Sequence, residues 1–299
     1  MYIKYEKFNN KYINITSQNN TKSQTSACLF SYFMISLVIK RYVEVLEKMI
    51  YVVSDIHGCY DTFLALLNKV KFDNTKDTLY ILGDIIDRGP ETWKMYEWVK
   101  EHLGKNVFMI MGNHEDMMIQ DVFSKYGRYL KENKPKNEWT EKDKKYISVY
   151  NKQPCVYDQY KTIKYLMSKG HSLEELVEMC EFFSTLPYYY EVEVNNKRFR
   201  LVHAYCRKEI EKTRPDEFIW NRDFAEYDVF CRGENVIFGH TPTICFDPKG
   251  NIIIEINEQA DASKINIDCG CVYNKDNKLC ILRLDDMKYW YQKNIDWRN

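Results

Sequence analysis

The chain has 299 residues, of which 45% are hydrophobic and 29% are charged, so it can bury a sizeable core in one large domain or two small ones. Lys and Arg number 43, and Asp and Glu also number 43, which makes the formal net charge zero at pH 7. This composition excludes a wholly disordered chain. It also lacks the basic character of dedicated nucleic-acid-binding or lipid-binding proteins, so we expect neither a nucleic acid nor a membrane as a partner.

The first 48 residues differ from the rest of the chain. They begin with a polar stretch rich in Asn, Thr, Ser and Gln, and an uncharged apolar run of thirteen residues follows at 27–39. That run is shorter than the ~20 residues of a membrane-spanning helix and lies too far along the chain for an ordinary secretory signal, which makes a membrane anchor the less favoured interpretation. We predict a poorly ordered extension over residues 1–48 and a folded domain over residues 49–299.

From Met49 onward, predicted strands and helices alternate. Continuous apolar runs predict strands, and apolar residues at a spacing of 3.6 predict helices. The predicted strands cover residues 50–53, 79–82 and 107–111, and the helices cover 60–70 and 90–103, with a further helix that begins near residue 115. Residues 120–186 are expected to be mostly helical, with one helix over 173–183 and a charged stretch at 131–145 that we interpret as a solvated surface or loop.

Beyond Pro187 the apolar period becomes two, which is typical of strands. Asn195-Asn196 predicts a tight turn between the first two of them. The predicted strands cover residues 189–194, 199–202, 236–238, 252–256, 265–268 and 279–284. Helices between the early strands and hairpins among the later ones indicate an α/β sandwich with mixed sheets.

The chain has ten cysteines and no Cys-x-x-Cys pair. Cys269 and Cys271 are the only two that lie close together in the sequence, and we expect them to pack in a sheet rather than bind a metal. Because no disulfide framework is visible, free thiols in a reducing compartment are expected, and this predicts a cytoplasmic location.

Short polar motifs follow five of the predicted strands. Ligands of open α/β sheets bind beyond the carboxyl ends of the strands, so these motifs are expected to meet at one rim. Four of the six histidines and five of the eleven glycines fall within them. The motifs are Asp55-Ile56-His57-Gly58, Gly83-Asp84-Ile85-Ile86-Asp87-Arg88-Gly89, Gly112-Asn113-His114-Glu115, His203 and Gly239-His240-Thr241.

Carboxylate, amide and imidazole side chains are ligands that suit Mn, Fe or Zn. One bridging Asp would hold two ions about 3.5–4 Å apart, and such a pair makes hydroxide available near neutral pH. Each motif alone has a plain structural interpretation, such as a loop, a helix cap or a buried histidine. Their combination in this order, each after a strand, predicts a metal centre.

Together these motifs resemble those of the calcineurin-like metallophosphoesterases and, more narrowly, of the serine/threonine phosphoprotein phosphatases of the bacterial and phage-lambda type. The resemblance runs from Met49 to about Asp285. It implies a four-layer α/β/β/α sandwich of mixed β-sheets with a helical insertion at 120–186. It also implies two divalent metal ions, with Mn as the first choice and Fe or Zn as alternatives.

The resemblance further implies a role for individual residues. Arg88 and Arg222, the latter within a Trp-Asn-Arg element, would bind the phosphate. His114, oriented by Asp87, would protonate the leaving oxygen. The implied metal ligands are Asp55, His57 and Asp84 for the first ion and Asp84, Asn113, His203 and His240 for the second.

Three residues bear on the choice of subgroup. Pro242 stands where many relatives carry a further histidine, which fits protein phosphatases and dinucleoside tetraphosphate hydrolases alike. Asp87 and Glu115 favour the protein phosphatases. The resemblance therefore implies a serine/threonine protein phosphatase that uses in-line attack by a metal-bridging hydroxide, with a symmetrical dinucleoside tetraphosphate (Ap4A) hydrolase as the alternative.

Substrate choice is the least constrained inference from the resemblance. Residues 150–154 lack the glycines that bacterial relatives carry there, and Tyr205 stands where a glycine is common. The expected substrate is a phosphorylated protein or a small phosphoester, and the oligomeric state stays open. A non-catalytic member that binds a partner through the same pocket is the remaining alternative.

Overall fold

The computed structural model describes residues 48–152 and 161–297. Lys48–Asn299 form one compact unit. The predictions for the N-terminal extension and its apolar run fall outside the described residues, as do residues 153 and 154 of the 150–154 segment. Within the described ranges, no helix combines the length and the apolar character needed to cross a bilayer.

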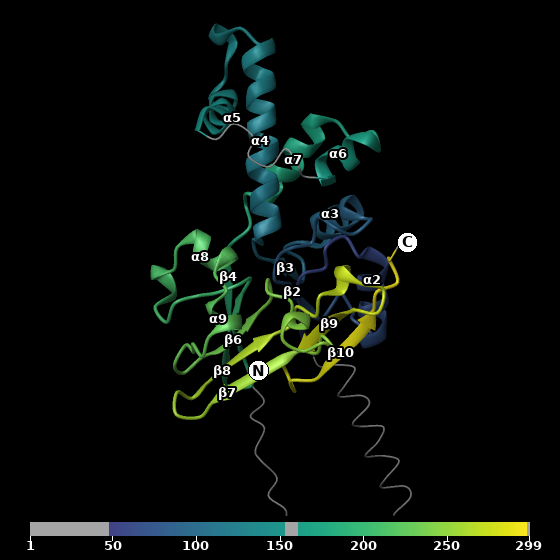
Figure 1. The fold of residues 1–299 in the computed structure, drawn as a ribbon, viewed down its shortest axis with the longest axis vertical. Coiled ribbons are helices and arrows are strands. Elements are labelled where there is room, and N and C mark those ends of the chain that lie inside the picture. Colours follow the sequence, from purple (N-terminus) through teal and green to yellow (C-terminus); the bar gives the residue numbers. More distant parts are fainter. Residues whose placement is uncertain (1–47, 153–160, 298–299) are drawn as a thin grey trace, which may run out of the picture. The chain divides into compact units, whose positions relative to one another are not determined.

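The described strands form two mixed sheets of five strands each (Figure 1). The first sheet has the order β10-β9-β1-β2-β3, in which β1, β2 and β3 run parallel. The second has the order β4-β5-β6-β8-β7, in which β5, β6 and β8 run parallel. The strands are β1 (Ile50–Val53), β2 (Thr78–Ile81), β3 (Val107–Met109), β4 (Tyr189–Val194), β5 (Lys197–Val202), β6 (Asn235–Phe238), β7 (Ile253–Asn257), β8 (Ala262–Asn266), β9 (Lys278–Arg283) and β10 (Tyr289–Lys293).

Helices complete the architecture. Short 3-10 turns occur at Lys136–Glu138, Ile210–Lys212, Thr243–Cys245 and Cys271–Tyr273. The helices are α2 (Tyr60–Val70), α3 (Thr92–His102), α4 (Asn113–Asn133), α5 (Glu141–Lys152), α6 (Lys161–Ser168), α7 (Leu173–Phe183), α8 (Pro215–Trp220) and α9 (Asp223–Glu226).

Alternation along the strands separates two hydrophobic cores. In β1, Val52 joins the core between the sheets, whereas Tyr51 and Val53 join the larger core that the helices cover. The core between the sheets contains Val52, Leu82, Ile110, Val194, Phe199, Leu201, Ile237, Ile265, Ile267, Leu282 and Leu284. Helix α2 packs on β9 and β10, and Phe224 of α9 meets Phe238 of β6 with ring centroids 5.6 Å apart. The predicted four-layer α/β/β/α sandwich of mixed sheets is therefore confirmed.

The β4–β5 hairpin shows how local chemistry sets the register. Asn195 and Asn196 both adopt left-handed conformations, with φ of 51° and 62°. A two-residue hairpin turn needs this conformation at both positions, and Asn tolerates it better than most residues. Val194 therefore pairs with Lys197, as the predicted turn requires.

Some predicted boundaries were wrong. The third strand ends at Met109 rather than residue 111, and Pro90 precedes α3 instead of opening it. Cys269 and Cys271 are buried, but they lie after β8 and in a 3-10 turn rather than in a strand. Strand β10 was not predicted, because its Tyr-Trp-Tyr-Gln-Lys sequence lacks apolar alternation. All described cysteines are free.

The charged stretch at 131–145 is more regular than predicted. Helix α4 continues to Asn133, and Pro135 lies in the short break that follows. Helix α5 then begins with a reciprocal cap, in which the Thr140 N–H donates to Asp143 Oδ2 at 2.7 Å and the Asp143 N–H donates to Thr140 Oγ1 at 3.1 Å. The charged residues of this stretch therefore lie mostly on the exposed faces of α4 and α5, and the irregular part is limited to the short segment between the two helices.

Gly127 lies buried in the middle of α4, where α5 packs closely against it. A Cβ atom at Gly127 would collide with the backbone carbonyl of Tyr146. Ala usually stabilises a helix interior by about 1 kcal/mol relative to Gly. We expect Gly127→Ala instead to lower the free energy of unfolding by about 1–3 kcal/mol, because a backbone atom cannot yield without separating the helices.

Urea unfolding measures this change. Ser148→Ala, at an exposed position of α5, is the matched control and should leave the free energy of unfolding unchanged or slightly raise it. Stabilisation by Gly127→Ala would show that the two helices are less closely packed than described.

Candidate metal centre

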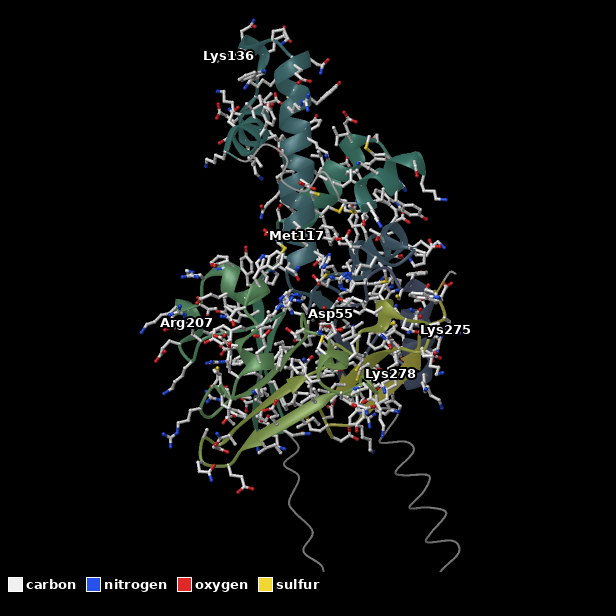
Figure 2. All side chains as sticks on the ribbon, in the orientation of Figure 1. Asp55, Met117, Lys136, Arg207, Lys275 and Lys278 are labelled. Carbon is white, nitrogen blue, oxygen red and sulfur yellow. The ribbon has the colours of Figure 1, made fainter. Side chains whose placement is uncertain are left out.

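The predicted ligands gather at one rim of the sandwich. They follow β1, β2 and β3 of the first sheet and β5 and β6 of the second, and Asn113 opens α4. Helix α4 thus begins at Asn113 rather than near residue 115, so two predicted site residues occupy its first turn. Figure 2 shows Asp55 near the foot of α4.

Asp84 lies at the centre of the cluster. Its Oδ2 is 3.6 Å from His57 Nε2, 3.6 Å from His203 Nε2 and 3.8 Å from His114 Nε2. Asp55 also contributes, because ligand atoms of Asp55, Asp84 and His203 lie within 4.8 Å of one another. A carboxylate placed in this way can be shared by two cations.

Asn113 joins the ligands of the second sheet. Its Oδ1 lies 3.0 Å from His203 Nε2 and 2.9 Å from His240 Nδ1. The backbone N–H of His240 donates to Asp55 Oδ2 at 3.1 Å, although the two residues are 185 positions apart in the chain. The structure therefore brings together all six residues that the resemblance implied as ligands.

Hydrogen bonds fix the orientation of two of the imidazoles. Nδ1 of His57 donates to the Ile86 carbonyl at 2.8 Å, and Nδ1 of His203 donates to the Leu82 carbonyl at 2.6 Å. Each bond leaves Nε2 as the unprotonated nitrogen, 3.6 Å from Asp84 Oδ2 in both residues. A backbone partner of this kind is what orients histidines toward metals.

The donor set fits divalent cations. Burial lowers the pKa of His57 and raises the pKa of Asp84, since each charged form is poorly solvated there. Nearby lone pairs repel one another unless a cation lies among them, and a bound cation reverses the effect of burial on the carboxylate. Nitrogen and oxygen donors without sulfur suit Mn, Fe or Zn.

His114 and Asp87 form a pair beside the cluster. His114 Nδ1 lies 2.6 Å from Asp87 Oδ2, and both side chains are buried. The backbone N–H of His114 donates to Asp84 Oδ1 at 3.0 Å, which ties the pair to the central carboxylate. The carboxylate on Nδ1 orients the ring so that Nε2 faces Asp84, 3.8 Å from its Oδ2.

Two arginines border the cluster. Arg88 Nη1 donates to His57 Nε2 at 2.5 Å, and its guanidinium carbon lies 5.1 Å from the centre of the Tyr273 ring. Arg222 Nη1 donates to Thr241 Oγ1 at 2.8 Å. Both guanidinium groups therefore lie beside predicted ligands of the cluster, Arg88 at His57 and Arg222 next to His240.

The backbone of the site is strained. Among the described non-glycine residues, eleven have positive φ, and six of these belong to the site. Left-handed backbone costs roughly 1–2 kcal/mol at such residues, so the surrounding fold must impose it. These six residues are Asp55 (51°), His57 (48°), Asp84 (54°), Asp87 (70°), Arg88 (68°) and His240 (66°).

Glu115 ends one of the predicted motifs, but the sequence did not reveal which groups its carboxylate bonds. Its carboxylate is fully buried and accepts three backbone N–H groups, from Asp84 at 2.8 Å, Ile85 at 2.9 Å and Gly112 at 3.1 Å. Burial raises the pKa of Glu115 to about 7, and the backbone N–H groups of Asp84 and Ile85 oppose that shift. Glu115 therefore holds the loop after β2 against the start of α4. Its place after Asn113-His114 was the only sequence signal.

Two glycines permit the close approach of the loops. A Cβ at Gly112 would collide with Asp84 and Glu115, and a Cβ at Gly239 would collide with Ser54 and Asp55. Glycine is thus required at these two positions because a side chain would not fit, and not because of the backbone conformation.

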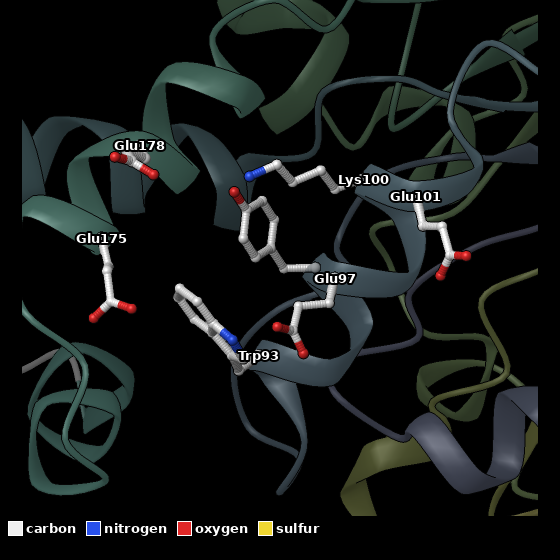
Figure 3. Close-up of a pocket in the computed structure, with 7 residues that line it drawn as sticks. Trp93, Glu97, Lys100, Glu101, Glu175 and Glu178 are labelled. Atoms are coloured by element: carbon white, nitrogen blue, oxygen red, sulfur yellow. The ribbon is translucent and has the colours of Figure 1, made fainter.

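A separate cavity of about 410 Å³ lies between α3 and α7 (Figure 3). None of the predicted site residues lines it. Its lining consists of Trp93, Tyr96, Glu97, Lys100, Glu101, Glu175 and Glu178.

The described site and fold agree with similarities to known proteins. The family model for calcineurin-like phosphoesterases matches residues 48–244. A crystal structure assigned provisionally as a diadenosine tetraphosphatase shares 16% identity with a TM-score of 0.51, over 84% of this chain and 95% of that one. At this identity the likeness concerns the fold alone.

Curated relatives match over a shorter stretch. The symmetrical bis(5'-nucleosyl)-tetraphosphatase of Photorhabdus laumondii is 44% identical over 88 residues, and that of Escherichia coli O139:H28 is 43% identical over 90 residues. These matches cover 29% and 30% of this chain and 30% of each relative. The chain therefore spans less than a third of the length of these relatives.

Glu115→Ala should leave three buried N–H groups without acceptors. We expect it to lower the free energy of unfolding by at least about 2–3 kcal/mol and to weaken Mn²⁺ binding, because Asp84 loses its support. Glu115→Gln keeps one acceptor oxygen and should have a smaller effect on both quantities. Urea unfolding and calorimetric Mn²⁺ titration measure the two effects.

Asp116→Asn, at the next position of the same helix, is the control, since within the described residues its side chain accepts a hydrogen bond only from Gln120, at 2.7 Å. It should change neither quantity appreciably. Normal Mn²⁺ affinity in a folded Glu115→Ala protein would contradict the role assigned to Glu115.

Proposed function

Because the chain belongs to the calcineurin-like phosphoesterase family and is thus a metallophosphoesterase that hydrolyses phosphoester bonds, we propose that it is a metal-dependent serine/threonine protein phosphatase. Its substrates would be phosphoserine and phosphothreonine side chains of proteins, with small phosphomonoesters accepted as well. The proposal extends to the bacterial and phage-lambda type of these phosphatases.

The pairing of His114 with Asp87 is the observation that supports a phosphomonoester substrate. Serine and threonine leave as alkoxides, which are strongly basic and need a proton as the P–O bond breaks. A polyphosphate anhydride has a phosphate leaving group, which needs this proton far less. The 2.6 Å contact between His114 Nδ1 and Asp87 Oδ2 supports a dedicated proton donor.

Two divalent cations would be held by the six rim residues, with Asp84 shared between them. Mn²⁺ is the proposed metal. When bound, such a pair lowers the pKa of a water molecule and neutralises charge on the phosphate. The oxygen and nitrogen donors of the site are those expected for this purpose.

Arg88 and Arg222 would bind the phosphate oxygens. A guanidinium offers two parallel N–H donors to a phosphate and keeps its charge at any physiological pH. Stabilising the charge of the transferring group is the main task in phosphoryl transfer, since little covalent chemistry is left to the protein.

A symmetrical dinucleoside tetraphosphate hydrolase is the alternative. The 43–44% identity to bis(5'-nucleosyl)-tetraphosphatases over about 90 residues favours it. The same metal ligands would serve both reactions, so the metal centre does not distinguish them.

A direct comparison of substrates tests the proposal. Protein loaded with Mn²⁺ should release phosphate from a phosphoserine peptide with a higher kcat/KM than it cleaves diadenosine tetraphosphate. An artificial aryl phosphate should also be hydrolysed. A clear preference for the dinucleotide would refute the protein phosphatase assignment, and inactivity on every phosphoester would favour a binding role.

Two substitutions should separate metal binding from proton donation. Asp84→Asn should weaken binding of both metals and nearly abolish turnover, because the shared carboxylate is lost. His114→Asn should lower kcat about 10²–10⁴-fold while the metal content stays normal. Phosphate release and elemental analysis measure the two effects.

His102→Asn is the matched control, because His102 lies on α3 outside the site and its Nδ1 bonds the Trp98 carbonyl. It should retain both metal and activity. Equal metal loss in the Asp84 and His114 variants would show that His114 has been assigned the wrong role.

A further inference from the structure

Arg222 has a neutral partner. Its Nη1 donates to the Thr241 hydroxyl at 2.8 Å and makes a longer contact of 3.4 Å with the His240 carbonyl. In the described part of the chain, no carboxylate pairs with the Arg222 guanidinium. A hydroxyl can fix the position of a cation without cancelling its charge, so the full charge of Arg222 stays available to an anion.

Thr241 is itself held firmly. It is buried, its backbone N–H donates to the Gly239 carbonyl at 2.7 Å, and its own carbonyl accepts a bond from Asn266 Nδ2 at 2.8 Å. Branching at Cβ further restricts the rotamers of threonine. The hydroxyl therefore has a fixed place relative to the backbone of the adjacent predicted ligand, His240.

We propose that Thr241 is a positioning residue that holds Arg222 in the orientation needed to bind phosphate. The proposal rests on the phosphate-binding role assigned to Arg222 above. An arginine side chain has many rotamers, and the conformational entropy that it loses on binding a ligand weakens the affinity. A guanidinium already tied by one nitrogen loses less freedom when its other nitrogens bind the phosphate.

The test compares Thr241→Val with Thr241→Ser. Valine keeps the shape and branching of threonine but cannot accept the bond from Arg222, whereas serine keeps the hydroxyl. With Mn²⁺-loaded protein, calorimetry with inorganic phosphate should show the Kd raised roughly three- to tenfold in Thr241→Val and near the wild-type value in Thr241→Ser. The melting temperatures of the two variants should agree, which separates positioning from a loss of stability.

A double-mutant comparison shows whether Thr241 acts through Arg222. Arg222→Ala should weaken phosphate binding, and adding Thr241→Val to it should cause no further loss. Wild-type affinity in Thr241→Val, or an equal loss with and without Arg222, would overturn the role of Thr241 alone. Unchanged affinity in Arg222→Ala would overturn the role of Arg222 and, with it, that of Thr241. Inorganic phosphate is a product of phosphomonoester hydrolysis only, because symmetrical cleavage of a dinucleoside tetraphosphate releases two nucleoside diphosphates. The binding measurement needs no turnover, so the substrate comparison described above tests the proposed function separately.

Discussion

Asp84 is a buried carboxylate with three imidazole nitrogens within 3.8 Å of one oxygen atom. Such a group is unfavourable in a dry interior unless a positive charge compensates it. The neighbouring groups hold Asp84 and the imidazoles close together instead of letting them move apart. Glu115 fixes the loop that carries Asp84, and backbone carbonyls fix the tautomers of His57 and His203. The rim is therefore arranged to bind cations. The six site residues with left-handed backbone are less stable in that conformation, and the fold holds them there because it places their side chains at the rim.

The sandwich explains how residues so far apart in the chain reach the same point. Parallel strands end on the same side of a sheet, and both sheets contribute parallel strands whose ends face one rim. The first sheet supplies Asp55, His57, Asp84 and Asn113, whereas the second supplies His203 and His240. Neither sheet alone would carry a complete set, so packing of the two sheets on one another is a condition for the site.

The sequence predicted the strands and the rim well because both depend on local patterns. Apolar runs that end in Asp, His or Asn place those residues at strand ends, whereas their meeting at one rim depends on the order and packing of the two sheets. The sequence did not predict hydrogen bonds between side chains and backbone groups that are far apart in the chain. Asp296, near the C-terminus, accepts the N–H groups of Asp61 and Thr62 at 3.1 and 2.8 Å and so caps α2, and no pattern near either site signals this. The three bonds to Glu115 and the bond between Arg222 and Thr241 depend in the same way on tertiary packing.

Helix α4 carries Asn113 and His114 in its first turn and continues for 21 residues, a length of ~30 Å. A helix is stiff over this distance, so a tilt at its far end also moves the residues at its start. Helix α4 packs along α5 and α7, so its tilt, and with it the position of both side chains, depends on those two helices. Substitutions at the α4–α5 and α4–α7 contacts, well away from the rim, therefore bear on where Asn113 and His114 are placed.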